Sequence, residues 1–118
     1  MLIKQSLVVM AGGALGALLR WRLSALNSLS HLPWGTVAAN LLGCFTVGLV
    51  LGSTRQGSMT HLFLVAGLCG AMTTFSTFIV ELLHAKSSTV AVAYTLGSLF
   101  GGLVLVWSGF RIARVISG

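Results

Sequence analysis

The sequence is poor in charged residues, and above all in acidic ones. Glu81 is the only acidic residue among 118, and charged residues make up 7% of the chain, whereas a soluble domain carries roughly 25%. A lone carboxylate excludes catalysis by paired carboxylates and argues strongly against enzyme chemistry. Hydrophobic residues make up 56% of the chain, and its mean hydropathy is +1.00. The composition therefore predicts an integral membrane protein that is not an enzyme.

Cysteine and catalytic motifs are equally scarce. Cys44 and Cys69 both fall within apolar segments and lack metal-ligand spacing, so we interpret them as small buried residues. No phosphate-binding loop, zinc motif or Ser-His-Asp set is found.

The basic residues give a net charge of +6, but they are scattered singly near the ends of the apolar segments. They are Lys4, Arg20, Arg22, Arg55, Lys86, Arg111 and Arg114. This arrangement is typical of membrane-surface anchors and excludes a nucleic-acid surface. If the N-terminus is cytoplasmic, four lie inside and three outside, so the positive-inside rule fixes no orientation. The balance permits insertion in both orientations and an antiparallel dimer.

Four membrane spans account for nearly the whole chain, because one span needs roughly 20 residues. We expect an all-α, single four-helix membrane domain over residues 1–118, with spans at about residues 6–26, 34–52, 61–84 and 88–110. Residues 27–33 form a polar turn, and Pro33 suits the start of the second helix. Four short helices enclose little interior, so we expect a homo-oligomer.

The third span carries an unusual stretch, residues 67–81, which reads GLCGAMTTFSTFIVE. Glycine and β-branched threonine are weak helix formers, so we predict an interruption of the helix over residues 70–75, in mid-membrane. Non-helical backbone at membrane depth persists only where it is buried in protein or lines a wet cavity. The interruption therefore predicts a functional site.

Other polar or small positions fall at helical spacing in the remaining spans. Gly12 and Gly16 offer a face for close helix packing. Arg20 either closes the first helix at the membrane surface or turns inward toward a polar cluster or Glu81. Asn40 must face protein or water, so it either bonds to a neighbouring helix or lines a pore. In the fourth span, Tyr94, Ser98 and Gly102 form a stripe of polar and then small residues.

This inventory suits a small, strongly hydrated anion. It offers neutral hydrogen-bond donors, and Phe75 and Phe78 can present ring edges, the positive end of the aromatic quadrupole. Such groups replace a water shell without trapping the ion, and conduction requires release as well as binding. The interruption also frees the carbonyls of Gly70 and Thr73, which are ligands for a hard cation.

The chain resembles the small fluoride-channel family known as Fluc or CrcB across all four spans. The likeness rests on Gly12, Gly13, Gly16 and Arg20, on Gly35, Thr36, Asn40 and Gly43, and on Gly67, Gly70, Thr73, Thr74, Phe75, Ser76, Thr77, Phe78 and Glu81. It implies an antiparallel, dual-topology homodimer in the inner (plasma) membrane, with two pores that export fluoride passively. It also implies a structural sodium ion at the dimer centre.

The resemblance implies a role for each matching residue. Phe75 and Phe78 would form aromatic boxes along the pores, with Asn40 as the donor beside them. Ser76 and Thr77 would be donors in the interruption, and Gly70 and Thr73 would give main-chain oxygens to sodium.

On the fourth span, Tyr94 and Ser98 would belong to a polar track for fluoride. Gly102 departs from the hydroxyl that often follows in the family, so water or another helix must substitute there. Glu81 matches the family's vestibule acid, with a solvated helix-end charge as the alternative.

Two other functions compete with this interpretation. A four-span multidrug transporter needs a membrane-embedded carboxylate, usually in the first helix, where this chain has none. A structural subunit or lysis protein would explain the glycine faces, but it predicts no specific need for Asn40, Phe75 and Phe78.

Overall fold

The computed structural model describes residues 1–28 and 32–118, and its regular elements there are all helical. They are α1 (Leu2–Leu23), the 3₁₀ helix η1 (Ser24–Ser28), α2 (Trp34–Ser53), α3 (Met59–His61), the π-helix η2 (Leu62–Cys69), α4 (Gly70–Met72), α5 (Phe75–Leu83) and α6 (Ser88–Ser117). Four segments are long and apolar enough to cross a membrane: Leu2–Ser28, Trp34–Ser53, Met59–Leu83 and Ser88–Ser117. The prediction of an all-α protein with four apolar spans is confirmed.

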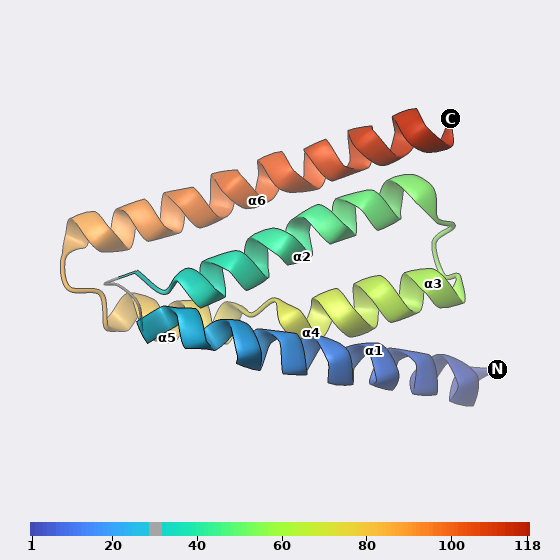
Figure 1. Cartoon of the computed structure of the whole chain (residues 1–118), viewed down its shortest axis with the longest axis horizontal. Coiled ribbons are helices and arrows are strands. Elements are labelled where there is room, and N and C mark those ends of the chain that lie inside the picture. The colour runs from blue at the N-terminus through green and yellow to red at the C-terminus, as the bar shows by residue number, and fades with distance from the viewer. Residues whose placement is uncertain (29–31) are drawn as a thin grey trace.

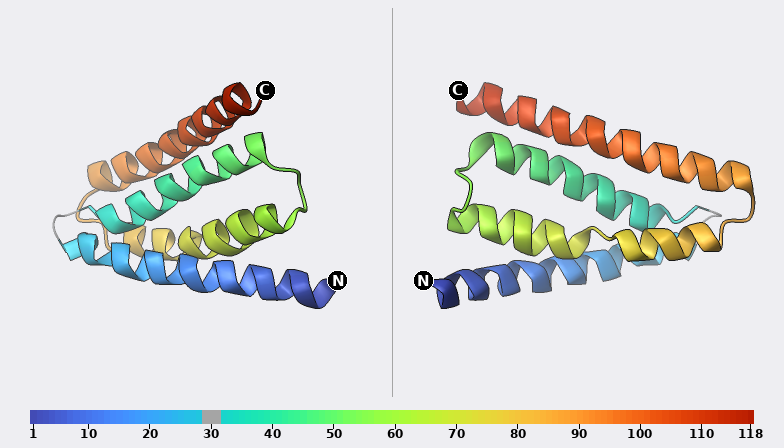
Figure 2. Two further views of the ribbon diagram at one scale, coloured as in Figure 1. Left: turned by 45° about the vertical axis from the view of Figure 1, so that its right-hand side comes forward. Right: turned by 180° about the vertical axis from the view of Figure 1, so that it is seen from behind.

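The four segments run up and down in a slab of 48 × 32 × 19 Å (Figure 1). Here α6 packs along α2, and α2 lies between α6 and the third segment, whose η2 part packs along α1. Figure 2 shows both termini and the α2–α3 loop at one end of the slab, with the α1–α2 and α5–α6 connections at the other. The polar residues of the third segment are thereby brought beside α2 and α6.

The helix ends differ from the expected spans at two places. The first helix begins at Leu2 and not at residue 6, and the last continues to Ser117 beyond residue 110. The apolar run ends at Arg111 and Arg114, but the helix continues beyond them. Arginine favours helix, and neither glycine nor proline follows until Gly118. Of the predicted turn at residues 27–33, Asn27 and Ser28 belong to η1, and residues 29–31 lie outside the described part of the chain.

Glycines set the distance between the packed helices. A Cβ atom at Gly12 would overlap the carbonyl oxygen of Phe63, and one at Gly16 would overlap that of Leu68. On the facing element, a Cβ at Gly67 would lie 2.8 Å from the Val9 carbonyl oxygen. Helix α1 and the third segment therefore approach each other backbone to backbone, an arrangement that favours glycine.

Side chains cap the starts of the later helices. Ser58 accepts a hydrogen bond from the main-chain N–H of His61 at 3.2 Å, and Ser87 accepts one from that of Val90 at 3.2 Å. In the loop before α3, Gly57 has a φ of 81°, a left-handed conformation that glycine adopts without strain.

Candidate functional site

The third segment is interrupted at two residues, Thr73 and Thr74. Thr73 has φ −82° and ψ 150°, and Thr74 has φ −150° and ψ 128°, so both are extended. Gly70, by contrast, is helical with φ −59° and ψ −36°, and Phe75 already opens α5. The irregular backbone is therefore narrower than the predicted residues 70–75, and glycine is not the residue at which the helix ends.

Asn40 of α2 holds the extended pair in place. The main-chain N–H of Thr74 donates to Asn40 Oδ1 at 2.9 Å, and Asn40 Nδ2 lies 3.5 Å from the Thr74 carbonyl oxygen. In a continuous helix that N–H would instead bond to the carbonyl of Gly70. A side chain of α2 thus takes the place of one helical hydrogen bond of the third segment.

Other main-chain groups around the interruption also have hydrogen-bond partners that differ from those in a continuous helix. The N–H of Thr77, which a continuous helix would direct to the Thr73 carbonyl, donates to Thr74 Oγ1 at 3.3 Å and so caps α5. Arg20 of α1 turns inward, and its Nε donates to the Ala71 carbonyl oxygen at 3.1 Å. The carbonyls of Gly70 and Thr73 thereby lose the N–H groups that a helix would give them.

A cavity of about 360 Å³ opens beside the interruption, and we call it the Asn40 cavity. It is lined by Asn40, Gly43, Cys44, Val47, Thr73, Thr74, Phe75, Phe78, Ser98, Leu99 and Val106. The rings of Phe75 and Phe78 have centroids 6.1 Å apart, and Phe75 is 75% exposed. The cavity thus brings Asn40, both phenylalanines and Ser98 together, with no charged side chain among its lining residues.

The carboxylate of Glu81 links the helices to one another at the other end of the site. Thr36 of α2 donates to Glu81 Oε1 at 2.6 Å, and Tyr94 of α6 donates to Oε2 at 2.6 Å. Asn27 of η1 adds a longer bond from Nδ2 to Oε1 at 3.4 Å. Hydrogen bonds to a charged group are roughly twice as strong as those between neutral groups. Glu81 therefore connects all four segments.

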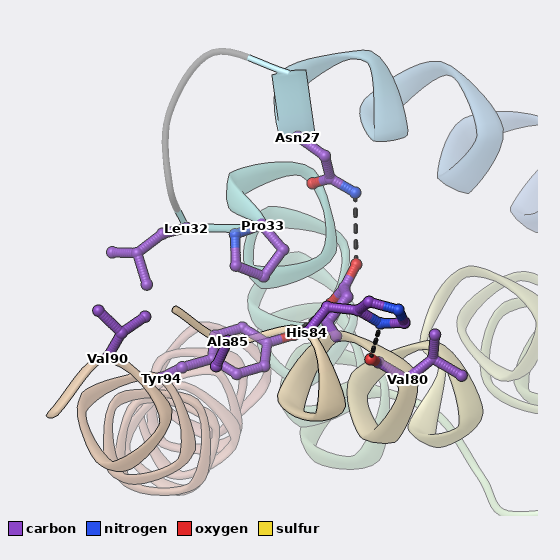
Figure 3. A pocket seen from close by; sticks show the side chains of 9 residues that line it. Asn27, Leu32, Pro33, Val80, His84, Ala85, Val90 and Tyr94 are labelled. Carbon is purple, nitrogen blue, oxygen red and sulfur yellow. Dashed lines mark hydrogen bonds between the residues drawn. The ribbon is translucent and has the colours of Figure 1, made fainter. Parts of the chain in front are cut away.

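A second cavity, of about 340 Å³, lies against this carboxylate and is lined by Asn27, Leu32, Pro33, Val80, Glu81, His84, Ala85, Val90 and Tyr94. Figure 3 shows Asn27 reaching into it from the end of η1, and the dashed line from Asn27 marks its bond to Glu81. The ring of Tyr94 stacks on that of Phe78 with centroids 4.9 Å apart. Phe78 lines the Asn40 cavity and Tyr94 lines the second cavity, so this aromatic pair lies between the two.

We expect loss of the Thr36 hydroxyl to destabilise this junction. Thr36 is 4% exposed and donates to a carboxylate, so Thr36→Val removes a charge-assisted bond worth about 1.5–3 kcal/mol. Thr46→Val is the matched control on the same helix, since the Thr46 hydroxyl donates to the Leu42 carbonyl oxygen of its own helix at 2.8 Å. Unfolding in detergent is the measurement, and equal midpoints for the two variants would contradict the expectation.

The predicted donors Ser76 and Thr77 lie in the first turn of α5 and form a hydroxyl cluster with Thr74. Thr74 Oγ1 donates to Thr77 Oγ1 at 3.3 Å and lies 3.3 Å from Ser76 Oγ. Thr77 also lines a third cavity, of about 280 Å³, with Arg20, Trp21, Ser24, Asn27, Gly35, Thr36 and Thr74. Thr77 therefore lies on the Arg20 side of the interruption, Thr74 lines both this cavity and the Asn40 cavity, and Ser76 is among the lining residues of neither.

Sequence reasoning missed the role of Asn27 and the carboxylate contact of Thr36. Asn27 Oδ1 accepts hydrogen bonds from the N–H groups of Gly35 at 2.7 Å and Thr36 at 3.3 Å, so it caps the start of α2. The available signal was an asparagine shortly before a helix start. The sequence predicts a small buried residue at Cys44, but the structure places Cys44 half-buried in the lining of the Asn40 cavity.

The fold and site together define a small four-helix membrane protein with an interrupted third segment and polar cavities between its helices. The family model described as "CrcB-like protein, Camphor Resistance (CrcB)" matches residues 7–110. The chain therefore belongs to the CrcB family.

Named relatives match almost the whole chain. A protein of Thermus thermophilus named "Fluoride-specific ion channel FluC" is 40% identical, and the match covers 98% of this chain and 100% of the relative. Proteins with the same name from Chlorobium phaeobacteroides and Marinobacter nauticus are 39% and 37% identical, with 98% and 95% of this chain covered and 98% and 96% of the relatives.

Proposed function

We propose that the protein is a fluoride-selective ion channel that passively exports fluoride from the cytoplasm and so protects the cell against fluoride toxicity. The observation that carries this proposal is the family membership, with relatives named as fluoride-specific channels over nearly the full length. The Asn40 cavity supports it, because its lining combines neutral polar groups with the rings of Phe75 and Phe78.

The chemistry of this lining fits a small hydrated anion. Amide and hydroxyl donors and positive ring edges can replace part of the water shell. A Lys or Arg in the cavity would hold the anion too tightly for rapid release, and conduction needs both steps. We propose that fluoride passes Phe75, Asn40, Phe78 and Ser98, and that Tyr94 continues the path toward Glu81 at the vestibule. Ser76 and Thr77 would serve as donors in the interruption.

The working unit of the proposal is an antiparallel, dual-topology homodimer with two pores. The exposed Phe75 and the apolar face of α6 around Leu99, Phe100 and Leu103 leave one side of the site open for a second copy. Lys4 lies in the first turn of α1, Arg55 follows α2, and Arg111 and Arg114 lie near the end of α6, whereas Arg20 and Arg22 lie near the end of α1 and Lys86 precedes α6. The helices run up and down, so four basic residues at one end face three at the other and neither orientation is favoured. The inner (plasma) membrane is the proposed location, with its lipid bilayer as the surrounding partner.

A structural sodium ion at the dimer centre completes the proposal. Its ligands would be the main-chain oxygens of Gly70 and Thr73, and both fit a hard cation because their helical N–H partners bond elsewhere. When bound, sodium would supply the positive charge that holds the interruptions of two copies together.

Fluoride efflux from liposomes containing the purified protein, in sodium buffer and with chloride as control, tests the channel directly. We expect rapid fluoride-selective efflux that falls about tenfold in Phe75→Leu and Phe78→Leu, which corresponds to roughly 1.4 kcal/mol on the barrier. Phe45→Leu is the control, because Phe45 lies on α2 and is not among the residues that line the Asn40 cavity. A folded protein that passes no fluoride would overturn the proposal.

A further inference from the structure

The wall of the Asn40 cavity lacks a side chain at Gly102 of α6. Ser98, Gly102 and Val106 are spaced by four residues and so share one face of α6. Ser98 and Val106 both line the cavity, and Gly102 is buried between them. A side chain from another element must therefore line the cavity between Ser98 and Val106.

Cys44 of α2 supplies this side chain. A Cβ atom added at Gly102 would lie 3.2 Å from Cys44 Sγ, its nearest neighbour outside α6 among the described residues. Cys44 lines the cavity and follows Asn40 by one helical turn. The sulfur thus lies directly beside the position at which a side chain of residue 102 would begin.

We propose that the Cys44 thiol is the hydrogen-bond donor that a permeating halide meets next to Ser98, in the place of a hydroxyl at position 102. This inference rests on the proposed channel function. Within residues 1–28 and 32–118 the thiol makes no disulfide or hydrogen bond, so its S–H is available to an ion in the cavity. A thiol is a weak, neutral donor, which suits transient binding.

Moving the hydrogen-bond donor from position 44 on α2 to position 102 on α6 tests this inference. Removing one hydrogen bond changes a rate by about five- to tenfold, so we expect Cys44→Ala to slow fluoride efflux by that factor and Cys44→Ser to keep it within about twofold of the unmodified protein. Adding Gly102→Ser to Cys44→Ala should restore efflux, because the new hydroxyl occupies the vacated space. Adding Gly102→Ala instead fills the same space without a donor and should restore nothing.

The outcomes separate this inference from the proposed function. If the unmodified protein passes no fluoride, the channel proposal fails and this inference with it. If it passes fluoride but Cys44→Ala is equally fast, or if Gly102→Ala rescues as well as Gly102→Ser, the thiol only fills space and this inference alone is overturned. Rates are compared per folded protein, with unfolding midpoints measured for each variant, so that lost stability is not read as lost conduction.

Discussion

Asn40→Asp is expected to abolish fluoride efflux while the protein still folds. The Oδ1 atom that accepts from the Thr74 N–H at 2.9 Å is retained, but the amide donors are replaced by a negative charge in the cavity wall. Two like charges about 4 Å apart repel by ~4 kcal/mol at the effective dielectric of a protein surface. That corresponds to a loss on the order of 10³-fold in rate, measured as fluoride release from liposomes.

Asn40→Ala separates the charge from the lost donor. It introduces no repulsion, so the fall in efflux should be closer to about tenfold, the effect of one lost hydrogen bond. Because Asn40→Ala also removes the Oδ1 atom that accepts from the Thr74 N–H, unfolding midpoints are measured beside the efflux and rates are compared per folded protein. Normal flux in Asn40→Asp would remove Asn40 from the ion path. Its contact with Thr74 would then be purely structural.

Gly16→Ala is expected to have the largest effect on stability. A Cβ there overlaps the carbonyl oxygen of Leu68, and its next neighbours are also main-chain atoms, so no side chain can move aside. Overpacking typically costs about 1–3 kcal/mol and more where backbone must shift, so we expect a loss of at least ~3 kcal/mol in the free energy of unfolding. Unfolding in detergent, followed by circular dichroism, measures it.

Gly13→Ala is the matched control on the same helix. Among the described residues outside α1, the nearest atom to its Cβ would be the Gly67 carbonyl oxygen at 4.0 Å, an ordinary contact. Because alanine favours helix over glycine by about 1 kcal/mol, this variant should be neutral or slightly more stable. Similar losses in both variants would show that the α1 glycines matter for a reason other than close approach to the third segment.

Hydropathy and length were sufficient to predict the four helical segments, because each contains an apolar run of the length that a bilayer requires. They could not predict that the third segment is interrupted at Thr73 and Thr74 alone. Local propensity points to Gly70, yet the helix ends where Asn40, thirty-four residues earlier in the chain, competes for the Thr74 N–H. A partner on another helix is invisible to local sequence patterns.

The same reason limits prediction of the site. Asn40, Phe75, Phe78 and Ser98 share a cavity, as their polar or aromatic character in apolar segments suggested. The junction at Glu81 depends on four segments meeting at one end of the slab, and the sequence alone left this residue as a vestibule acid or a solvated charge. The contact between Cys44 and Gly102 is a matter of a few ångströms between two helix faces, which helical periodicity does not resolve.

The length of α6 has a consequence for how the molecule sits in lipid. Its 30 residues span about 45 Å, whereas the hydrocarbon core is ~30 Å thick, and the stretch from Ser88 to Trp107 already covers that depth. The remaining turns hold the guanidinium of Arg111 5.9 Å from the Trp107 ring centre and that of Arg114 5.8 Å from that of Phe110. Arginine beside an aromatic ring suits the headgroup region, so we expect the end of α6 to anchor the protein at that surface and the α2–α6 pair to tilt in a bilayer of different thickness.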